Sequence, residues 1–354
     1  MSLIAFLQQL KEKQIFISQK DGRLAVKGNK KAITGEIKSR LSASKLAIVQ
    51  LYADLGLQSN EQLAPVTESQ ERLWFITEMG GNDAVFNIPL AGRLNGKLDI
   101  KAMEATFNTI LQRHDSLRTR FIVDGNKPHQ VVQSHRDVKL LVTDLSHIEG
   151  EALLQEQVRE LVHQEAIKPF DLTQDLLLRA QLLRLNETEF VLLYTLHHIA
   201  ADGWSVGVLT NEINALYNAY AQQLPNPLLE LEIQFSDYAH WERQRAGQGS
   251  FDAQVYYWQH QLAGLPQVHS LPLDKPRTSV QTYQGSTVVN HIDRSIVEDF
   301  SQLCQTRGTT LFMGLHASFS LLLSVYSGEK DIVVGTSIAN REHPGVGSLI
   351  GFFL

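Results

Sequence analysis

Two adjacent histidines and an aspartate follow a short apolar segment in the middle of the chain. Residues 190–196 are rich in β-forming types and predict a buried strand, which leads directly into His197, His198 and the pair Asp202-Gly203. Successive side chains of a strand point to opposite faces, so one imidazole must face the core and the other a cavity. Titratable side chains at the end of a buried strand are typical of a catalytic site.

A neutral imidazole at this place suits general base catalysis. Histidine has a reference pKa of about 6.5 and an α-amine one of about 7.7 to 8.0, so imidazole can take the proton of an attacking amine near neutral pH. We assign this catalytic role to His198. Gly203 has no Cβ, and its backbone N–H can therefore approach a developing oxyanion closely. A zinc site on His198 and Asp202 would need a third ligand that the sequence does not supply, so we predict no metal.

Five segments of the chain resemble motifs of one protein family. The pattern from His197 to Gly203, with Asp202 after three intervening residues, resembles the motif HHxxxDG of the condensation domains of nonribosomal peptide synthetases, which are related to chloramphenicol acetyltransferase. The other four occur in the family's order, with Ser337 where a proline is common. They are 69–75 (SQERLWF), 113–121 (RHDSLRTRF), 235–241 (FSDYAHW) and 334–341 (VGTSIANR).

The resemblance implies an acyltransferase of secondary metabolite biosynthesis that forms amide bonds. Such a domain transfers a donor acyl or peptidyl thioester to the amine of an acceptor aminoacyl group, and both are carried on the phosphopantetheine arms of carrier domains. No directly bound cofactor is implied, and the donor and acceptor carrier domains are partners. Residues 73–75 and 202–205 resemble the subtype that joins an L-configured donor to an L-configured acceptor. Two alternatives remain, a coenzyme A-dependent acyltransferase and a non-catalytic interaction module.

The resemblance also implies a structural role for Asp202. In related domains this acid turns away from the catalytic histidine and pairs with an arginine that holds the loop. Arg341 is the first candidate for that arginine and Arg118 the second. The other residues with expected structural roles are His197 in the core, Trp204 packed beneath the loop, and Ser205 at the start of the next helix.

Composition agrees with an enzyme of the cytoplasm. The chain has 354 residues, of which 43% are hydrophobic and 20% charged, enough for more than one domain. A net charge of −6 argues against nucleic-acid binding. No apolar stretch is long enough to span a membrane, and the N-terminus lacks the features of a signal peptide. The single cysteine excludes an internal disulfide, which suits a reducing compartment.

The N-terminal residues form a basic segment with a pattern of its own. Residues 1–64 hold 10 Lys and Arg against 5 Asp and Glu, whereas the remaining residues hold 22 against 33. We expect a helix over 3–10, a hairpin with its turn at Asp21-Gly22, and one helix from Thr34 to just before Gly56. This order resembles the tubulysin-type docking domains, through the motif 21–24 and the region 45–46. The resemblance implies that the segment recognises the C-terminal tail of an upstream synthetase, and its basic charge predicts an acidic tail.

These observations predict an α/β fold with four parts. Two chloramphenicol acetyltransferase-like lobes are expected in a V-shaped arrangement, after a small helix-hairpin-helix docking domain. The second lobe is expected to be truncated, because the family's next motif would begin where the sequence stops, and we expect impaired activity. In that lobe we predict strands at 283–292 and 331–334 and a buried helix at 311–327. The predicted parts are a docking domain (1–56), a linker (57–66), an N-terminal lobe (67–245) and a partial C-terminal lobe (246–354).

Overall fold

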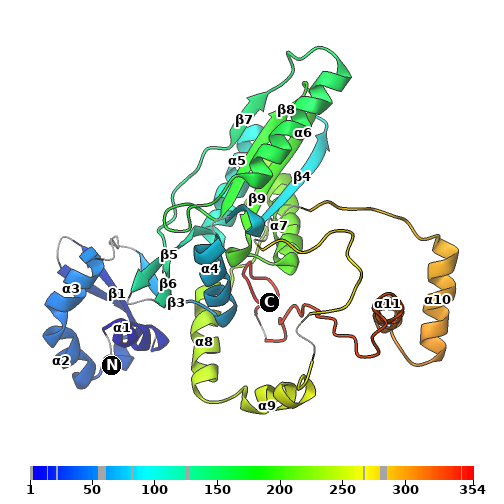
Figure 1. Ribbon diagram of the computed structural model, residues 1–354. Coiled ribbons are helices and arrows are strands. Elements are labelled where there is room, and N and C mark those ends of the chain that lie inside the picture. Colours follow the sequence, from blue (N-terminus) through cyan, green and yellow to red (C-terminus); the bar gives the residue numbers. More distant parts are fainter. Residues whose placement is uncertain are drawn as a thin grey trace. The chain divides into compact units, whose positions relative to one another are not determined.

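The computed structural model divides the chain into two compact units (Figure 1). Unit 1 comprises Met1–Phe251 together with Ala339–Leu354, and unit 2 comprises Asp252–Ile338. The last residues, which we assigned to the second lobe, therefore pack with the first part of the chain. The structure describes residues 3–13, 15–20, 23–54, 61–80, 83–124, 127–265, 268–279, 285–343 and 345–354.

A four-stranded mixed sheet in the order β4-β9-β8-β7 forms the centre of unit 1. β4 and β8 both pair with β9 antiparallel, whereas β7 and β8 run parallel. Asn87 at the start of β4 lies opposite His197 at the end of β9, so the predicted catalytic segment leaves the sheet at this edge. The strands are β4 (Asn87–Asn95), β7 (Leu141–Asp144), β8 (Leu178–Arg184) and β9 (Glu189–His197).

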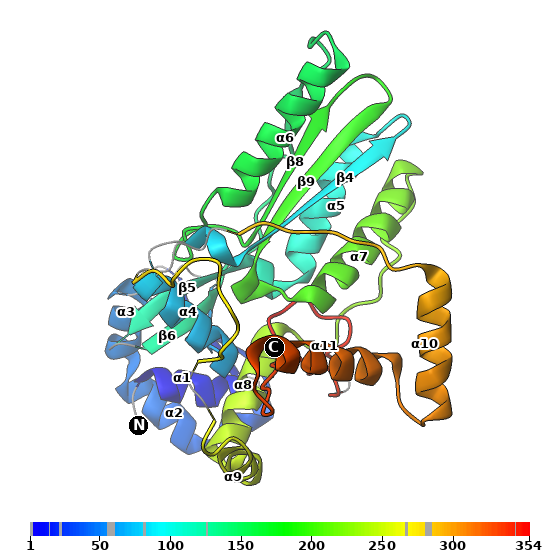
Figure 2. The same ribbon diagram turned by 45° about the vertical axis from the view of Figure 1, so that its right-hand side comes forward.

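Helices cover both faces of this sheet, which confirms the predicted α/β class (Figure 2). Phe190, Leu192 and Leu196 of β9 belong to one buried cluster with α5 and α7, whereas Val191 and Leu193 belong to another with α6. Because both faces are covered, β9 is apolar along nearly its whole length instead of alternating with polar residues. The covering helices are α5 (Ile100–Arg113), α6 (Glu151–Ile167) and α7 (Gly203–Ala221).

A second, three-stranded antiparallel sheet has the order β3-β6-β5. Its edge strand β3 lies in the predicted linker, so residues 62–65 belong to the fold instead of connecting two domains, while residues 57–60 lie outside the described part. Leu63 and Ala64 of β3 are buried, because pairing with β6 brings them into the core. The strands are β3 (Gln62–Pro65), β5 (Thr119–Asp124) and β6 (Lys127–Val132).

The N-terminal segment contains a helix, two paired strands and two further helices. The helix expected after Thr34 is interrupted at Ser44, whose N–H bonds to the carbonyl oxygen of Arg40 and closes α2. The expected turn at Asp21-Gly22 lies outside the described residues. The elements are α1 (Leu3–Glu12), β1 (Ile15–Lys20), β2 (Arg23–Gly28), the short 3-10 helix η1 (Lys30–Ala32), α2 (Gly35–Ala43) and α3 (Lys45–Asp54).

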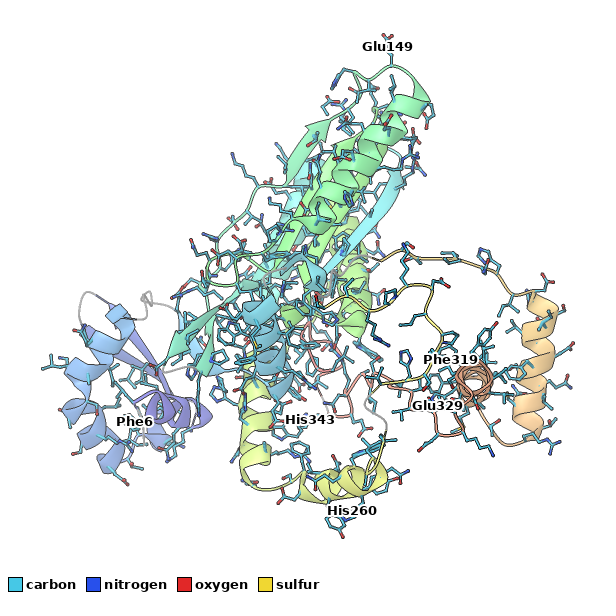
Figure 3. All side chains as sticks on the ribbon, in the orientation of Figure 1. Phe6, Glu149, His260, Phe319, Glu329 and His343 are labelled. Atoms are coloured by element: carbon cyan, nitrogen blue, oxygen red, sulfur yellow. The ribbon has the colours of Figure 1, made fainter. Side chains whose placement is uncertain are left out.

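The core of this segment continues into the second sheet. Phe6, which Figure 3 labels among these elements, is 2% exposed and belongs to one buried cluster with Leu63 of β3 and Val131 of β6. An apolar cluster shared in this way resists separation, because parting its two sides would expose apolar surface to water. The segment therefore packs as part of unit 1, although its charge differs from that of the rest.

Unit 2 contains three helices in its described residues, α9 (Asp252–Gln261), α10 (Arg294–Thr306) and α11 (Leu311–Ser327). The strand predicted at 331–334 is not formed, nor is that at 283–292 within its described residues 285–292, because neither segment has a strand partner for its backbone groups. α11 has no buried residue, so its predicted burial is wrong. In the described ranges, no single helix has the length and apolarity to cross a membrane. The consecutive helices α10 and α11 reach that length and apolarity only when taken together, and the chain bends by 103° between them.

Candidate active site

The turn between β9 and α7 carries the predicted catalytic residues. β9 ends at His197, a short 3-10 helix η4 (His198–Ala200) follows, and α7 begins at Gly203. The carboxylate of Asp202 caps α7 by accepting a hydrogen bond of 2.8 Å from the N–H of Ser205. Ser205, which we expected to begin the helix, is instead the third residue of α7, and the capping position belongs to Asp202.

His197 lies in the core on one side of β9. It is fully buried between the rings of Phe86 and Phe170, and its Nδ1 accepts a hydrogen bond of 3.1 Å from the N–H of Ile199. Burial, with smaller contributions from the neighbouring His198 and Arg179, lowers the pKa of His197 to about 3. The ring is therefore neutral at physiological pH and holds the turn by its hydrogen bond.

His198 lies on the other side of the strand end and is half-buried. Its ring packs edge-on against Phe352, with 4.9 Å between the ring centroids. Nδ1 is enclosed and has no hydrogen-bond partner within the described structure, so Nε2 is the atom that can meet a substrate. The two adjacent histidines thus have different surroundings, because β9 ends at His197 and His198 begins η4.

The low pKa of His197 predicts a pH-dependent stability. The unfolded chain binds a proton at His197 below about pH 6.5, whereas the folded protein binds it only near pH 3. The contribution of His197 to the free energy of unfolding is complete above about pH 6.5. It falls by about 1.4 kcal/mol per pH unit as the pH is lowered toward 3. Urea unfolding from pH 7 to 4 should therefore show a steeper loss for the wild type than for His197→Asn, which keeps an acceptor for Ile199 but does not titrate. If the free energy of unfolding depends on pH in the same way for the wild type and His197→Asn, His197 is not the titrating group.

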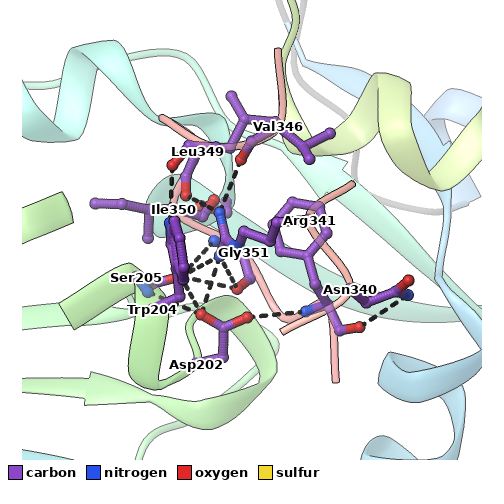
Figure 4. A network of polar contacts seen from close by, with 12 residues as sticks. Asp202, Trp204, Ser205, Asn340, Arg341, Val346, Leu349, Ile350 and Gly351 are labelled. Atoms are coloured by element: carbon purple, nitrogen blue, oxygen red, sulfur yellow. Dashed lines mark hydrogen bonds and ion pairs between the residues drawn. The ribbon is translucent and has the colours of Figure 1, made fainter. Parts of the chain in front are cut away.

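Asp202 forms a buried ion pair with Arg341 (Figure 4). The distance from Arg341 Nη2 to Asp202 Oδ1 is 2.9 Å, and the two side chains are 3% and 1% exposed. Asp202 Oδ2 also accepts a hydrogen bond of 3.3 Å from the N–H of Phe353. Arg118, the second candidate partner, instead donates to the carbonyl oxygen of Gln133. Asp202 therefore holds the loop and makes no hydrogen bond to His198 in the described structure.

Arg341 also binds the backbone of the last residues. Its Nη1 donates to the carbonyl oxygens of Val346 and Leu349, at 2.9 and 2.6 Å, and its guanidinium lies 4.0 Å from the ring centroid of Phe353. Burial lowers the pKa of Arg341, and the carboxylate of Asp202 opposes this shift. The segment is thereby fixed against the start of α7, together with Phe352, which contacts the ring of His198.

Trp204 and Gly203 both lie at the exposed start of α7. Trp204 is 52% exposed and donates from Nε1 to the carbonyl oxygen of Gly347 at 2.9 Å, so it does not pack beneath the loop as expected. A Cβ at Gly203 would meet no atom within 4 Å, so the space beside this residue is open. The N-terminus of a helix favours negative charge, and its first N–H groups have no partner within the helix.

Glu212 anchors α7 and was not among the residues predicted from the sequence. Its carboxylate accepts hydrogen bonds of 2.8 Å from Arg113 Nε and from His114 Nε2, and His114 Nδ1 accepts one of 3.3 Å from the N–H of Ile350. Burial favours a higher pKa for Glu212, but the bonds and charges of His114 and Arg113 outweigh it and lower the pKa. The only sequence signal was a single acid on the apolar face of a helix.

The arrangement permits proton transfer beside a helix N-terminus. An imidazole with an accessible Nε2 can accept a proton, and the first N–H groups of α7 can stabilise an oxyanion. The sole cysteine, Cys304, is buried in α10 of unit 2. Across the described ranges, no group of three or more His, Cys, Asp or Glu side chains is placed to hold a metal ion.

Comparison with known proteins gives consistent matches. A family model described as "Condensation domain" matches residues 60–354. The chain is 39% identical to a linear gramicidin synthase of Brevibacillus parabrevis over 90% of its length, and 41% identical to malpibaldin synthetase of Mortierella alpina over 81%. It spans only 6% and 5% of these two relatives. The X-domain from teicoplanin biosynthesis is 29% identical, with a TM-score of 0.72 over 82% of this chain and 63% of that structure.

Proposed function

Because the chain belongs to the condensation-domain family, we propose that it forms an amide bond between a donor acyl or peptidyl thioester and the amine of an acceptor aminoacyl group. Donor and acceptor are carried on phosphopantetheine arms, so the two carrier domains are its partners. The observation that carries the proposal is the placement of His198, which is half-buried beside the open N-terminus of α7 on a turn held by the pair Asp202 and Arg341.

The reaction needs one proton acceptor and one oxyanion site. The acceptor nitrogen attacks the thioester carbonyl carbon, and the new C–N bond forms as the amine proton passes to Nε2 of His198. The oxyanion is stabilised by N–H groups at the start of α7, beginning with Gly203. When the C–S bond breaks, the thiolate leaves and takes the proton from His198. The thioester is already activated, so the reaction needs no covalent enzyme intermediate.

Mass spectrometry of the product tests the proposal and its alternatives. Donor and acceptor carriers are loaded, the chain is added, and transfer is compared with that from the same acyl group on coenzyme A. Amide formation from the carrier-bound donor supports the proposal. Preference for the coenzyme A donor would indicate a coenzyme A-dependent acyltransferase. The absence of transfer from either donor would indicate a non-catalytic interaction module.

We also propose that the donor and acceptor are both L-configured. The support is the resemblance of residues 73–75 and 202–205 to the motifs of that subtype. Loading the donor carrier with peptidyl groups that differ only in the configuration of their last residue tests it. Equal transfer of the D-configured donor would contradict the assignment.

We propose further that the N-terminal segment docks an acidic tail of an upstream synthetase. Among the described strands β2 pairs only with β1, so its other edge can accept an extended peptide. Lys31, Lys38 and Lys45 are exposed, and Leu46 beside them is 83% exposed. These residues offer positive charge and an exposed apolar contact in the same segment as β2.

The docking proposal predicts binding that depends on salt. We expect Lys45→Glu to weaken binding of an acidic peptide to the whole chain several-fold at 0.01 M salt, because the Debye length is then about 30 Å. At 1 M salt, with a Debye length of about 3 Å, the difference from the wild type should nearly vanish. Lys97→Glu, at an exposed lysine outside this segment, is the control and should bind like the wild type. Fluorescence anisotropy measures both, and binding that ignores salt would contradict the electrostatic contribution.

A further inference from the structure

The buried side chain of Gln70 reaches the turn that carries His198. Gln70 lies in α4 (Glu68–Gly80) and is 1% exposed. Its Nε2 donates a hydrogen bond of 3.0 Å to the carbonyl oxygen of Ile199, the residue directly after His198. We propose that Gln70 is a positioning residue, which fixes this turn and thereby the imidazole of His198. The inference rests on the proposed function, in which His198 is the base.

The amide of Gln70 can take only one orientation. Its Oε1 accepts a hydrogen bond of 3.1 Å from the N–H of Thr67, and its Nε2 also donates to Oε1 of Gln130 at 3.2 Å. The amide of Gln130 is itself oriented, because its Nε2 donates to the carbonyl oxygen of Pro65 at 2.6 Å. A flipped Gln70 amide would oppose two acceptors, so the network keeps its donor directed at Ile199.

Helix α4 is in turn held by α8 (Phe235–Gly247). The carboxylate of Glu242 accepts a hydrogen bond of 2.9 Å from the N–H of Glu68, the first residue of α4. Arg243 donates from Nε to the carbonyl oxygen of Val66 at 2.7 Å and forms an ion pair with Glu71. The start of α4 is therefore attached to α8 at several atoms, so the backbone that carries Gln70 is held in place. A catalytic group keeps its geometry only when such a supporting shell is itself fixed.

The turn at His198 depends on this bond. η4 has three residues, and its backbone is closed by a bond of 3.3 Å from the N–H of Ala201 to the carbonyl oxygen of His198. Ile199 is fully buried, so without Gln70 its carbonyl oxygen would lack a partner and the turn would rotate toward another donor. A displacement of about 1 Å at a reacting group can cost roughly 100-fold in rate.

Gln70→Glu removes the donor and keeps the acceptor. One carboxylate oxygen still accepts from Thr67, but the other opposes the carbonyl oxygen of Ile199. We expect kcat for amide formation to fall about 10- to 100-fold at pH 7.5, with KM for the donor carrier unchanged. A protonated carboxyl group can donate again. The kcat of the variant relative to the wild type should therefore rise as the pH is lowered, which loss of packing alone would not produce.

Two controls separate positioning from stability. Thr67→Val removes the hydroxyl that accepts from the N–H of Gln70 at 3.1 Å but leaves the bond to Ile199, so it should lower the melting temperature with little effect on kcat. Gln222→Glu removes a side-chain amide at the exposed far end of α7, where it donates to the carbonyl oxygen of Asn218 at 2.9 Å. This substitution should change neither the melting temperature nor kcat. Gln70→Met, which has no buried carboxylate, replaces Gln70→Glu if that variant does not fold.

The outcomes distinguish this inference from the proposed function. Gln70 variants whose loss of kcat is no larger than that of Thr67→Val at a similar loss of melting temperature would overturn the positioning role. A shift of the His198 ring signal in ¹⁵N NMR spectra of the Gln70 variants, absent in Thr67→Val, would support it. If the wild type forms product through His198 and the Gln70 variants match it, only the positioning role fails. If His198→Ala matches the wild type, the proposed function fails.

Discussion

Replacing His198 by alanine should lower kcat for amide formation by about 10²- to 10⁴-fold, the range typical of a positioned general base. Neither titratable neighbour of His198 in the described turn can take over the proton. His197 is fully buried on the opposite side of the strand end, with its pKa lowered to about 3 by burial, and Asp202 is committed to Arg341. Single-turnover transfer between loaded carriers, followed by mass spectrometry, measures the loss.

His147→Ala is the matched control for this substitution. His147 is an exposed histidine of the same unit, outside the site, so its removal should leave both melting temperature and turnover unchanged. His198→Ala should lower the melting temperature only slightly, because its half-buried ring makes no hydrogen bond within the described structure and loses only its edge-on contact with Phe352. Undiminished product formation by His198→Ala would show that another group is the base, or that the domain does not catalyse the transfer.

Asp202→Ala should lower the free energy of unfolding by about 3 to 5 kcal/mol, which makes it mainly a folding defect. The substitution leaves the guanidinium of Arg341 buried without its partner, and it also removes the cap of α7. Urea unfolding measures the loss. Glu189→Ala is the control, since Glu189 pairs with Arg93 at 3.8 Å with both side chains more than 40% exposed, and its loss should be at most about 1 kcal/mol.

A double substitution tests the physical reason. Removing both charges, as in Asp202→Asn with Arg341→Met, leaves no unpaired buried charge, although it also removes the bonds of Arg341 to Val346 and Leu349. The double substitution should therefore cost less than the sum of Asp202→Asn and Arg341→Met measured singly. If instead Asp202→Ala unfolds like the wild type and loses only turnover, Asp202 acts directly in the reaction.

Much of the local structure could be predicted from periodicity. The apolar run 190–196 became β9, and the helix expected over 3–10 is α1 (Leu3–Glu12). Each of these elements carries its pattern within its own residues. The strand expected at 331–334 is not formed. A strand also requires a neighbouring strand for its backbone hydrogen bonds, and the local sequence pattern does not show whether one is present.

By itself, the sequence determined the α/β class, the family, and the two histidines that must face opposite sides of a strand. Of the groups that hold their turn, Arg341 was expected from the family resemblance, whereas Gln70 was identified only from the tertiary structure. Gln70 and the carbonyl oxygen of Ile199 are 129 residues apart, and Asp202 and Arg341 are 139 apart. Side-chain type and spacing specify local geometry. Contacts over such separations arise only when packing of the whole unit brings the segments together, so the bond from Gln70 to Ile199 and the role of Glu212 became recognisable only in the folded chain.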